Sequence, residues 1–270
     1  MSSMKNRIIP KNSFKYAYYR LLGFFNFFYE LVKPPKITDY KKIPIIINNF
    51  NRLESVKKLI ASLEKRGYKN IYIIDNLSTY PPLLQYYDNC KYPIFRLEKN
   101  LGKNALWLSG IYNRFKDDFF VYSDSDIVPI DECPDDFLLF YLKVLKSHKF
   151  AQKVGFSLKI DDLPDCYSMK EEVISYEQFF YKHKVSDLLY FAPIDTTFAL
   201  YRPRAKRRHA NYNIEMYRTA YPYEARHLPW YIDSNNPDEE NLFFVKQKLV
   251  GTAWSRKLQG FIKDGNNNIS

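Results

Sequence analysis

The sequence predicts an α/β protein whose central sheet is mostly parallel and flanked by helices. Apolar runs of strand length alternate four times with helical patterns between residues 43 and 126, which is typical of βαβ units. With 270 residues, 46% of them hydrophobic, the chain can bury a large core. We expect one domain in two halves, 37–133 and an irregular 134–270, with an aromatic and basic helical segment, 1–36, before it.

Each element of the first half is predicted from a local signal. Short runs rich in β-branched and aromatic residues indicate buried strands. Helices are expected where apolar residues recur on one face, where proline opens a segment or where glycine ends it. We expect Asn51 to cap the first of these helices. The strands are expected at 43–50, 70–75, 92–98 and 119–122, and the helices at 52–66, 81–89 and 102–115.

The second half is less regular. Its amphipathic stretches predict two helices and one strand, followed by a pair of extended segments that is broken near Pro193 and, further on, by a C-terminal helix. The helices are expected at 135–148 and 168–183, the strand at 153–160 and the extended pair within 187–202.

Polar residues follow all four strands of the first half. Ligands of parallel sheets bind outside the carboxyl ends of the strands, so four polar tips at one edge predict a ligand site there. The tips are Asn48, Asn49, Asn51 and Arg52 after the first strand, Asp75, Asn76 and Ser78 after the second, Asn100 and Gly102 after the third, and Asp124 and Asp126 after the fourth.

Two aspartates close the fourth strand in the sequence DDFFVYSDSDIVP, residues 117–129. If the extended conformation continues through this tip, Asp124 and Asp126 point to the same side and Ser125 points away. Two carboxylates so close repel each other, and a divalent cation would remove the repulsion. The alternative is an ordinary turn, which Asp and Ser both favour.

Taken in order, these tips resemble a known pattern. The segments PIIINNFNR, IIDNLST, EKNLGKNALWLSG and the Asp-x-Asp sequence VYSDSDIVP, each after a strand, are similar to those of nucleotide-sugar-dependent glycosyltransferases of the Rossmann-like GT-A fold, especially glycosyltransferase family 2. The resemblance covers residues 43–232. The family's processive Gln-x-x-Arg-Trp motif is absent, and its Glu-Asp or Asp-Asp base motif has no clear counterpart, so a polymerising synthase is not expected.

The resemblance implies roles for the strand tips. Asn49, Asn51 and Arg52 would lie against the nucleotide, Asp75 and Asn76 would face the base, typically uracil, and Asn100 and Gly102 would let the backbone approach base or ribose. Asp124 would contact the ribose or a metal-bound water. Asp126 would bind Mn²⁺ or Mg²⁺, and His227 is the candidate that completes the metal site, although a lone histidine is often structural.

The resemblance also implies a carboxylate that takes the proton of the acceptor hydroxyl in an inverting transfer. Asp195 is the first choice, with Asp161, Asp162 and Glu239 behind it, although Asp195 could equally accept backbone hydrogen bonds in a turn. Asp161 and Asp162 could also bind the acceptor. Trp230 and Tyr231 could stack on a sugar ring or belong to the core.

Composition constrains the partners. The net charge of +11 and a pI near 9.3 favour acidic partners. The basic cluster YRPRAKRRH, residues 201–209, could be a solvated loop or a phosphate or membrane contact. Residues 14–33 could form a helix at a membrane interface or pack on the domain. Cys90, Cys133 and Cys166 have no paired spacing, which favours a reducing cytoplasm.

The sequence therefore predicts a metal-dependent glycosyltransferase that moves a sugar from a nucleoside diphosphate donor, with uridine diphosphate expected, to a glycan or lipid-linked acceptor. We expect it in the cytoplasm, possibly at the inner face of the membrane, building a bacterial-type surface polysaccharide or lipopolysaccharide. The alternative is a non-catalytic basic module that binds nucleic acid or an anionic surface. No glycine-rich phosphate loop follows the first strand, which argues against nucleotidylyl transfer and Walker-type hydrolysis.

Overall fold

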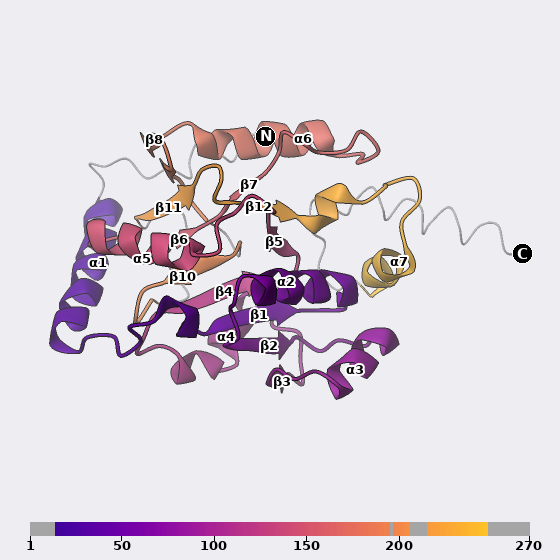
Figure 1. Cartoon of the computed structure of the whole chain (residues 1–270), viewed down its shortest axis with the longest axis horizontal. Coiled ribbons are helices and arrows are strands. Elements are labelled where there is room, and N and C mark those ends of the chain that lie inside the picture. Colours follow the sequence, from indigo (N-terminus) through magenta and orange to yellow (C-terminus); the bar gives the residue numbers. More distant parts are fainter. Residues whose placement is uncertain (1–13, 195–196, 206–214, 248–270) are drawn as a thin grey trace, which may run out of the picture.

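The computed structural model describes residues 14–194, 197–205 and 215–247 (Figure 1). A sheet of nine strands in the order β3-β2-β1-β4-β10-β6-β11-β9-β8 forms its centre. The four strands of the first half are parallel neighbours. They are β1 (Ile45–Asn49), β2 (Ile71–Asp75), β3 (Ile94–Arg96) and β4 (Phe120–Asp124). The predicted α/β class, with a large central sheet flanked by helices, is confirmed.

The second half of the chain completes the same sheet. Strand β10 lies between β4 and β6 and is antiparallel to both. These strands are β6 (Lys153–Gly155), β8 (Lys184–Ser186), β9 (Leu189–Phe191), β10 (Ala199–Tyr201) and β11 (Met216–Thr219). A second, small sheet has the order β5-β12-β7 and consists of β5 (Ile127–Pro129), β12 (Glu224–His227) and β7 (Ser157–Leu158).

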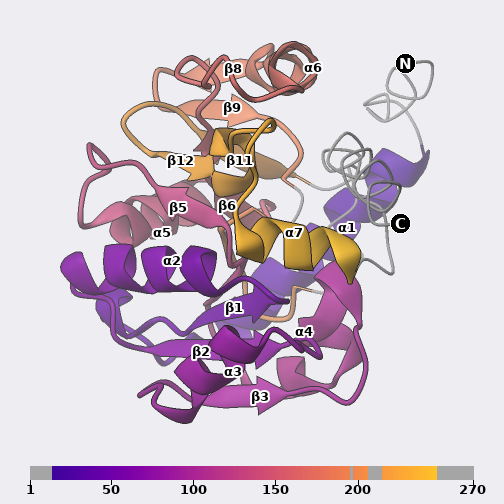
Figure 2. The ribbon, with the colours of Figure 1, turned by 90° about the vertical axis from the view of Figure 1, so that its right-hand side faces the viewer.

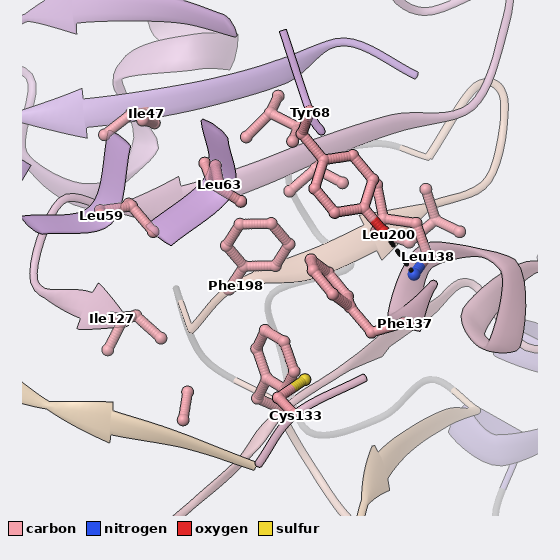
Figure 3. Close-up of a cluster of buried hydrophobic side chains, with 14 of the residues drawn as sticks. Ile47, Leu59, Leu63, Tyr68, Ile127, Cys133, Phe137, Leu138, Phe198 and Leu200 are labelled. Carbon is pink, nitrogen blue, oxygen red and sulfur yellow. Dashed lines mark hydrogen bonds between the residues drawn. The ribbon is translucent and has the colours of Figure 1, made fainter. Parts of the chain in front are cut away.

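Helices cover both faces of the large sheet (Figures 1 and 2). The larger hydrophobic cluster packs β1 and β10 against α2 and α5 through Ile47, Leu63, Phe137 and Leu200 (Figure 3). The α-helices are α1 (Phe14–Val32), α2 (Leu53–Lys65), α3 (Pro81–Asp88), α4 (Ala105–Leu108), α5 (Phe137–Ser147), α6 (Lys170–Glu177) and α7 (Glu239–Lys246). The 3-10 helices are η1 (Tyr40–Lys42), η2 (Gly102–Asn104), η3 (Ile111–Arg114), η4 (Gln178–Tyr181) and η6 (Leu228–Tyr231).

Three local expectations were wrong. The helix expected at 102–115 is three short turns, because Gly110 adopts a left-handed φ of 80° between α4 and η3. The strand expected at 153–160 is divided between the two sheets, since β6 pairs with β10 and β11 whereas β7 pairs with β12. The N-cap position of α2 is Arg52, and Asn51 instead has a φ of 52°.

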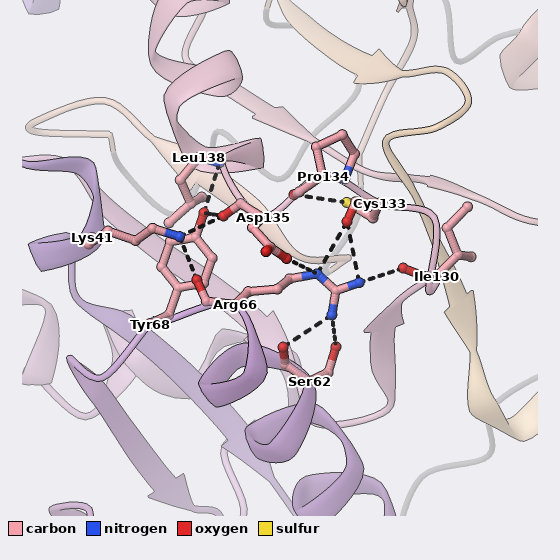
Figure 4. A network of polar contacts seen from close by, with 9 residues as sticks. All are labelled: Lys41, Ser62, Arg66, Tyr68, Ile130, Cys133, Pro134, Asp135 and Leu138. Carbon is pink, nitrogen blue, oxygen red and sulfur yellow. Dashed lines mark hydrogen bonds and ion pairs between the residues drawn. The ribbon is translucent and has the colours of Figure 1, made fainter.

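A buried guanidinium holds the segment after β5 against α2 (Figure 4). Arg66 is 4% exposed and donates to the carbonyl of Ile130 at 2.6 Å and more weakly to that of Cys133 at 3.4 Å. It also donates to the Oγ of Ser62 at 2.8 Å within α2. Because buried carbonyls need partners, this one side chain fixes the position of the loop that follows the Asp-x-Asp sequence.

Candidate nucleotide and metal site

The tips of β1, β2 and β4 are joined by side-chain amides. Asn48 is paired in register with Asp124, and its Nδ2 donates to Asp124 Oδ1 at 3.3 Å and to the carbonyl of Gly102 at 3.5 Å. Asn76 Nδ2 donates to the same carbonyl at 3.1 Å, while its Oδ1 accepts from the N–H of Leu101 at 2.7 Å. The predicted polar edge therefore exists as one connected network.

The loop after β3 leaves free space at its glycine. Gly102 has a φ of 60°, and a Cβ added there would meet none of the described residues within 4 Å. Asn100 Oδ1 accepts from the N–H of Gly102 at 2.8 Å and so holds the loop in this conformation. The backbone at Gly102 is therefore accessible, and the approach of a base or ribose to it, which the resemblance implies, stays a prediction.

Asn49 and Asn51 point into the protein. Asn49 is 1% exposed, donates to the hydroxyl of Tyr87 at 2.8 Å and accepts from that of Ser125 at 2.6 Å. The Oδ1 of Asn51 accepts from the N–H groups of residues 79 and 80 at 2.7 and 3.0 Å. Since both amide oxygens are used inside the protein, we do not assign these two residues a direct contact with a nucleotide.

Asp75 shares the Asn49 side of the sheet, because the two residues are paired in register. It is 3% exposed, and its Oδ1 accepts from the N–H of Ser78 at 3.1 Å. Burial raises the pKa of Asp75 above its ordinary value, although the hydrogen bonds from Ser78 oppose this rise. The role that the resemblance implies for Asp75, facing the base, stays a prediction.

Asp126 and His227 are brought together by the small sheet. Strand β12 runs antiparallel to β5 with His227 opposite Ile127, and the N–H of Leu228 donates to the carbonyl of Asp126 at 2.9 Å. The Nε2 of His227 lies 3.5 Å from Oδ2 of Asp126. Burial by itself would raise the pKa of Asp126, but His227 and Arg52 together hold it below the ordinary value.

These two residues fit a divalent cation. Within the described residues, Oδ1 of Asp126 and Nδ1 of His227 are buried and have no hydrogen-bond partner. The separation of 3.5 Å between carboxylate and imidazole is close to the ~3 Å between adjacent ligands of one Mg²⁺ or Mn²⁺ ion. No three His, Cys, Asp or Glu side chains of the described residues gather into a metal-binding group. An ion here would therefore need phosphate oxygens as well, as is usual for magnesium at nucleotide sites.

A turn separates Asp124 from Asp126. The extended conformation ends at Asp124, and Ser125 and Asp126 form a turn before β5. The expectation that the strand continues through the tip was therefore wrong, and the alternative of a turn is correct. Oδ1 of Asp124 accepts from Asn48, whereas Oδ2 of Asp126 faces His227.

Helix α7 covers the predicted nucleotide residue Arg52. The guanidinium donates to Oδ1 of Asn241 and lies 3.8 Å from the ring centroid of Phe244. A pocket of about 260 Å³ remains between α2, η6 and α7, with Arg52, Tyr231 and Glu240 among its lining residues. A larger pocket of about 590 Å³ lies at the opposite edge, where β2 begins, and holds none of the predicted site residues.

The residues predicted to bind the acceptor differ in burial and in their partners. Trp230 is 2% exposed and packs edge-on against the ring of His227 at 4.6 Å, so it supports the histidine and cannot stack on a sugar. Asp162 accepts from the hydroxyl of Tyr231 at 2.5 Å and from Arg226 at 2.6 Å. Burial tends to raise the pKa of Asp162, but these two donors lower it below the ordinary value. Asp162 is therefore a weak base.

The remaining candidate bases differ in placement. Asp161 is exposed and forms an ion pair with Lys159 at 2.7 Å. Glu239 is exposed at the start of α7. Asp195, the predicted catalytic base, lies outside the described residues, as do Lys206, Arg207 and Arg208 of the basic cluster.

Sequence reasoning missed two residues at this edge. The polar tip Asn48 is predicted there, and period-two alternation places it on the opposite side from Asn49. Glu240 and Asn241 had no local signal, since they reach the edge from the end of the chain through tertiary contacts.

Comparisons with known proteins add a likeness to solved structures. No protein-family model matches the chain, and no curated protein matches it in sequence. Among solved structures, the chain is similar to a mannosyltransferase from Pyrobaculum calidifontis in complex with GDP-Man and Mn²⁺. That match has a TM-score of 0.40 and 10% sequence identity, and it covers 87% of this chain and 74% of the other.

Proposed function

We propose that this protein is a metal-dependent glycosyltransferase that uses a nucleoside diphosphate sugar. The observation that carries the proposal is the pair Asp126 and His227, whose facing atoms are 3.5 Å apart at the carboxyl edge of the parallel strands. Each of the two side chains also has a buried polar atom without a partner among the described residues. A partly buried carboxylate and an imidazole that face each other are suitable ligands for a hard or borderline cation.

Different residues of this edge would bind the cation, the ribose and the base. Asp126 and His227 would hold the cation, which would stabilise the charge that develops on the departing diphosphate. Asn48, Asp124 and Gly102 form the connected network beside them, so a ribose would find both donors and acceptors there. The open space over Gly102 would admit the base or the ribose.

An inverting transfer would also need a base for the acceptor hydroxyl. Asp195 remains our choice for this base. Asp162 already accepts hydrogen bonds from Tyr231 and Arg226, and the lowered pKa of Asp162 makes it a poor proton acceptor. Tyr231 borders the pocket of about 260 Å³ and is the better candidate for contact with a sugar than the buried Trp230. The donor that we expect is a uridine diphosphate sugar, and the acceptor a glycan or a lipid-linked glycan of a surface polysaccharide.

Calorimetric titration with uridine diphosphate, with and without Mn²⁺ at fixed salt, tests this function. We expect binding that appears or tightens with the metal, because the phosphates and Asp126 would share the ion. The same titration with guanosine, cytidine and thymidine diphosphates identifies the base. If no nucleoside diphosphate binds in the presence of the metal, the proposal is wrong, and the basic binding module becomes the better interpretation of the +11 charge.

A further inference from the structure

Helix α1 presents an apolar stripe to solvent. Its residues recur with spacings of three and four along Phe14–Val32, so they lie on one face. The exposed side chains of this face are Phe14 (89%), Tyr18 (42%), Leu21 (51%), Phe24 (47%), Phe25 (56%), Phe28 (53%), Leu31 (63%) and Val32 (71%). A continuous exposed row of large apolar side chains marks an interaction surface.

The opposite, polar face of α1 packs on the domain. Glu30 forms an ion pair at 2.7 Å with Arg202, whose side chain is 2% exposed. Asn26 donates to Gln152, and Tyr29 donates to Asp117 at 3.2 Å. The usual arrangement of a surface helix is thus reversed, because Asn26, Tyr29 and Glu30 face the domain whereas the large apolar side chains face water.

Two further contacts fix this orientation. Gly23 lies so close to the chain at residue 150 that an added Cβ would be 2.7 Å from the carbonyl oxygen there. Arg202 also donates to the carbonyls of Ala151 at 2.7 Å and His148 at 3.1 Å. A rotation of α1 that hid the apolar stripe would separate Glu30 from Arg202 and leave a buried guanidinium without its carboxylate, which is costly. The stripe is therefore held outward.

The surroundings of the stripe are basic. Arg20, Lys33, Lys36 and Lys149 are exposed beside it, and Lys149 lies 5.4 Å from the ring centroid of Phe27. Glu30, the single acidic residue within α1, faces the domain. Asp117, whose side chain is 45% exposed, pairs with Lys33 and Arg204, so basic residues still outnumber acidic ones here. Two copies of this helix packed together would bring surfaces of like net charge near each other, whereas anionic headgroups supply the opposite charge.

We infer that the apolar stripe of α1 docks the protein on the surface of an anionic lipid bilayer. The rings and aliphatic side chains would enter the boundary between headgroups and acyl chains, and the flanking lysines and arginine would contact lipid phosphates. No helix of the described ranges is long and apolar enough to cross a bilayer. Helices α1 and α7 lie at opposite ends of the molecule (Figures 1 and 2), so docking would leave the strand tips facing water. This inference does not depend on sugar transfer.

Vesicle sedimentation with a matched pair of variants tests it. Phe25→Glu/Phe28→Glu changes two side chains of the stripe, and Val185→Glu/Tyr221→Glu makes the same change in charge at two apolar residues of similar exposure elsewhere. On vesicles of phosphatidylcholine with phosphatidylglycerol, we expect the stripe variant to bind at least about tenfold more weakly than the unchanged protein, and the control within about twofold of it. Binding to phosphatidylcholine alone should be weaker, and added salt should reduce binding to the mixed vesicles.

Four outcomes would overturn the inference. The unchanged protein could fail to bind either vesicle, or both variants could lose binding equally, which would indicate a diffuse charge effect. Sedimentation velocity could reveal a dimer that the stripe variant abolishes without any vesicle binding, so that a second copy is the occupant. A fall in the melting temperature of the stripe variant by more than about 5 °C would mean that the chain itself covers the stripe.

Discussion

Glu240 caps helix α2 at Leu53 from 187 residues away along the chain. Its Oε2 accepts from the N–H of Leu53 at 2.7 Å and from that of Glu54 at 2.8 Å. The first N–H groups of a helix have no partner within the helix, and a carboxylate there also complements the helix dipole. Helix α7 therefore completes the edge of the sheet at which the candidate site lies.

Replacing Glu240 by Ala should lower the free energy of unfolding by about 1–2 kcal/mol, because two N–H groups at the start of α2 lose their acceptor. Glu240→Gln should cost less, since an amide oxygen still accepts. Urea unfolding of both variants checks this prediction. Equal losses for Ala and Gln would indicate that the charge of Glu240, and not its acceptor oxygen, stabilises the helix.

The contribution of Glu240 to the free energy of unfolding should depend on pH. Burial raises the pKa of Glu240, although hydrogen bonds from the backbone and the charge of Arg52 oppose this rise. The folded protein therefore holds the proton of Glu240 more firmly than the unfolded chain does. This contribution to stability is complete below the ordinary glutamate pKa of about 4.3 and is lost as the pH rises through the higher folded value. Relative to Glu240→Gln, the unchanged protein should lose stability over that window, and parallel pH profiles would contradict the assignment.

Asp126→Ala should abolish metal-dependent binding of a nucleoside diphosphate and leave the fold intact. The carboxylate lies at a strand tip and contributes little to the core, but it would be one of only two described protein ligands of the ion. We expect the apparent affinity for Mn²⁺ to fall at least about tenfold. Calorimetry measures the affinity and circular dichroism the fold, and Asp161→Ala, which removes an exposed carboxylate, is the control. An unfolded Asp126→Ala protein would assign Asp126 a structural role.

Arg66→Leu should lower the free energy of unfolding by about 3 kcal/mol, since buried carbonyls at Ile130 and Cys133 lose a charged donor. Lys57→Leu, on the same helix, is the matched control. Lys57 forms an exposed ion pair with Glu54, so its loss should cost less than about 0.5 kcal/mol. Urea unfolding of the two variants compares them, and similar losses would mean that the network around Arg66 adds no stability beyond that of an exposed pair.

Cys133 should resist alkylation in the folded protein. Burial raises the pKa of its thiol to about 12, so the reactive thiolate is scarce at neutral pH. Cys166 is exposed and should react with iodoacetamide first. Mass spectrometry of the labelled peptides checks this order, with urea-unfolded protein as the control in which all three cysteines react. Rapid labelling of Cys133 without urea would indicate that the segment after β5 opens readily.

Local patterns were enough to predict the parallel half of the sheet. The strands around Ile47, Ile73 and Val121 are short β-branched runs between helical patterns, and the structure pairs them in parallel. Their polar ends meet at one edge, because parallel strands that are crossed over by helices must end on the same side. The presence of Asn48, Asn76 and Asp124 at one edge thus followed from the sequence.

The sequence by itself determined the α/β class and the edge at which polar residues gather, because both depend on the periodicity of neighbouring residues. Only the tertiary structure decided that Asp126 meets His227, that Asn49 points inward and that α7 covers Arg52. It also decided that α1 turns its apolar face outward. Each of these facts depends on a contact between residues far apart in the chain, and the geometry of such contacts is set by how the elements pack and not by any local propensity.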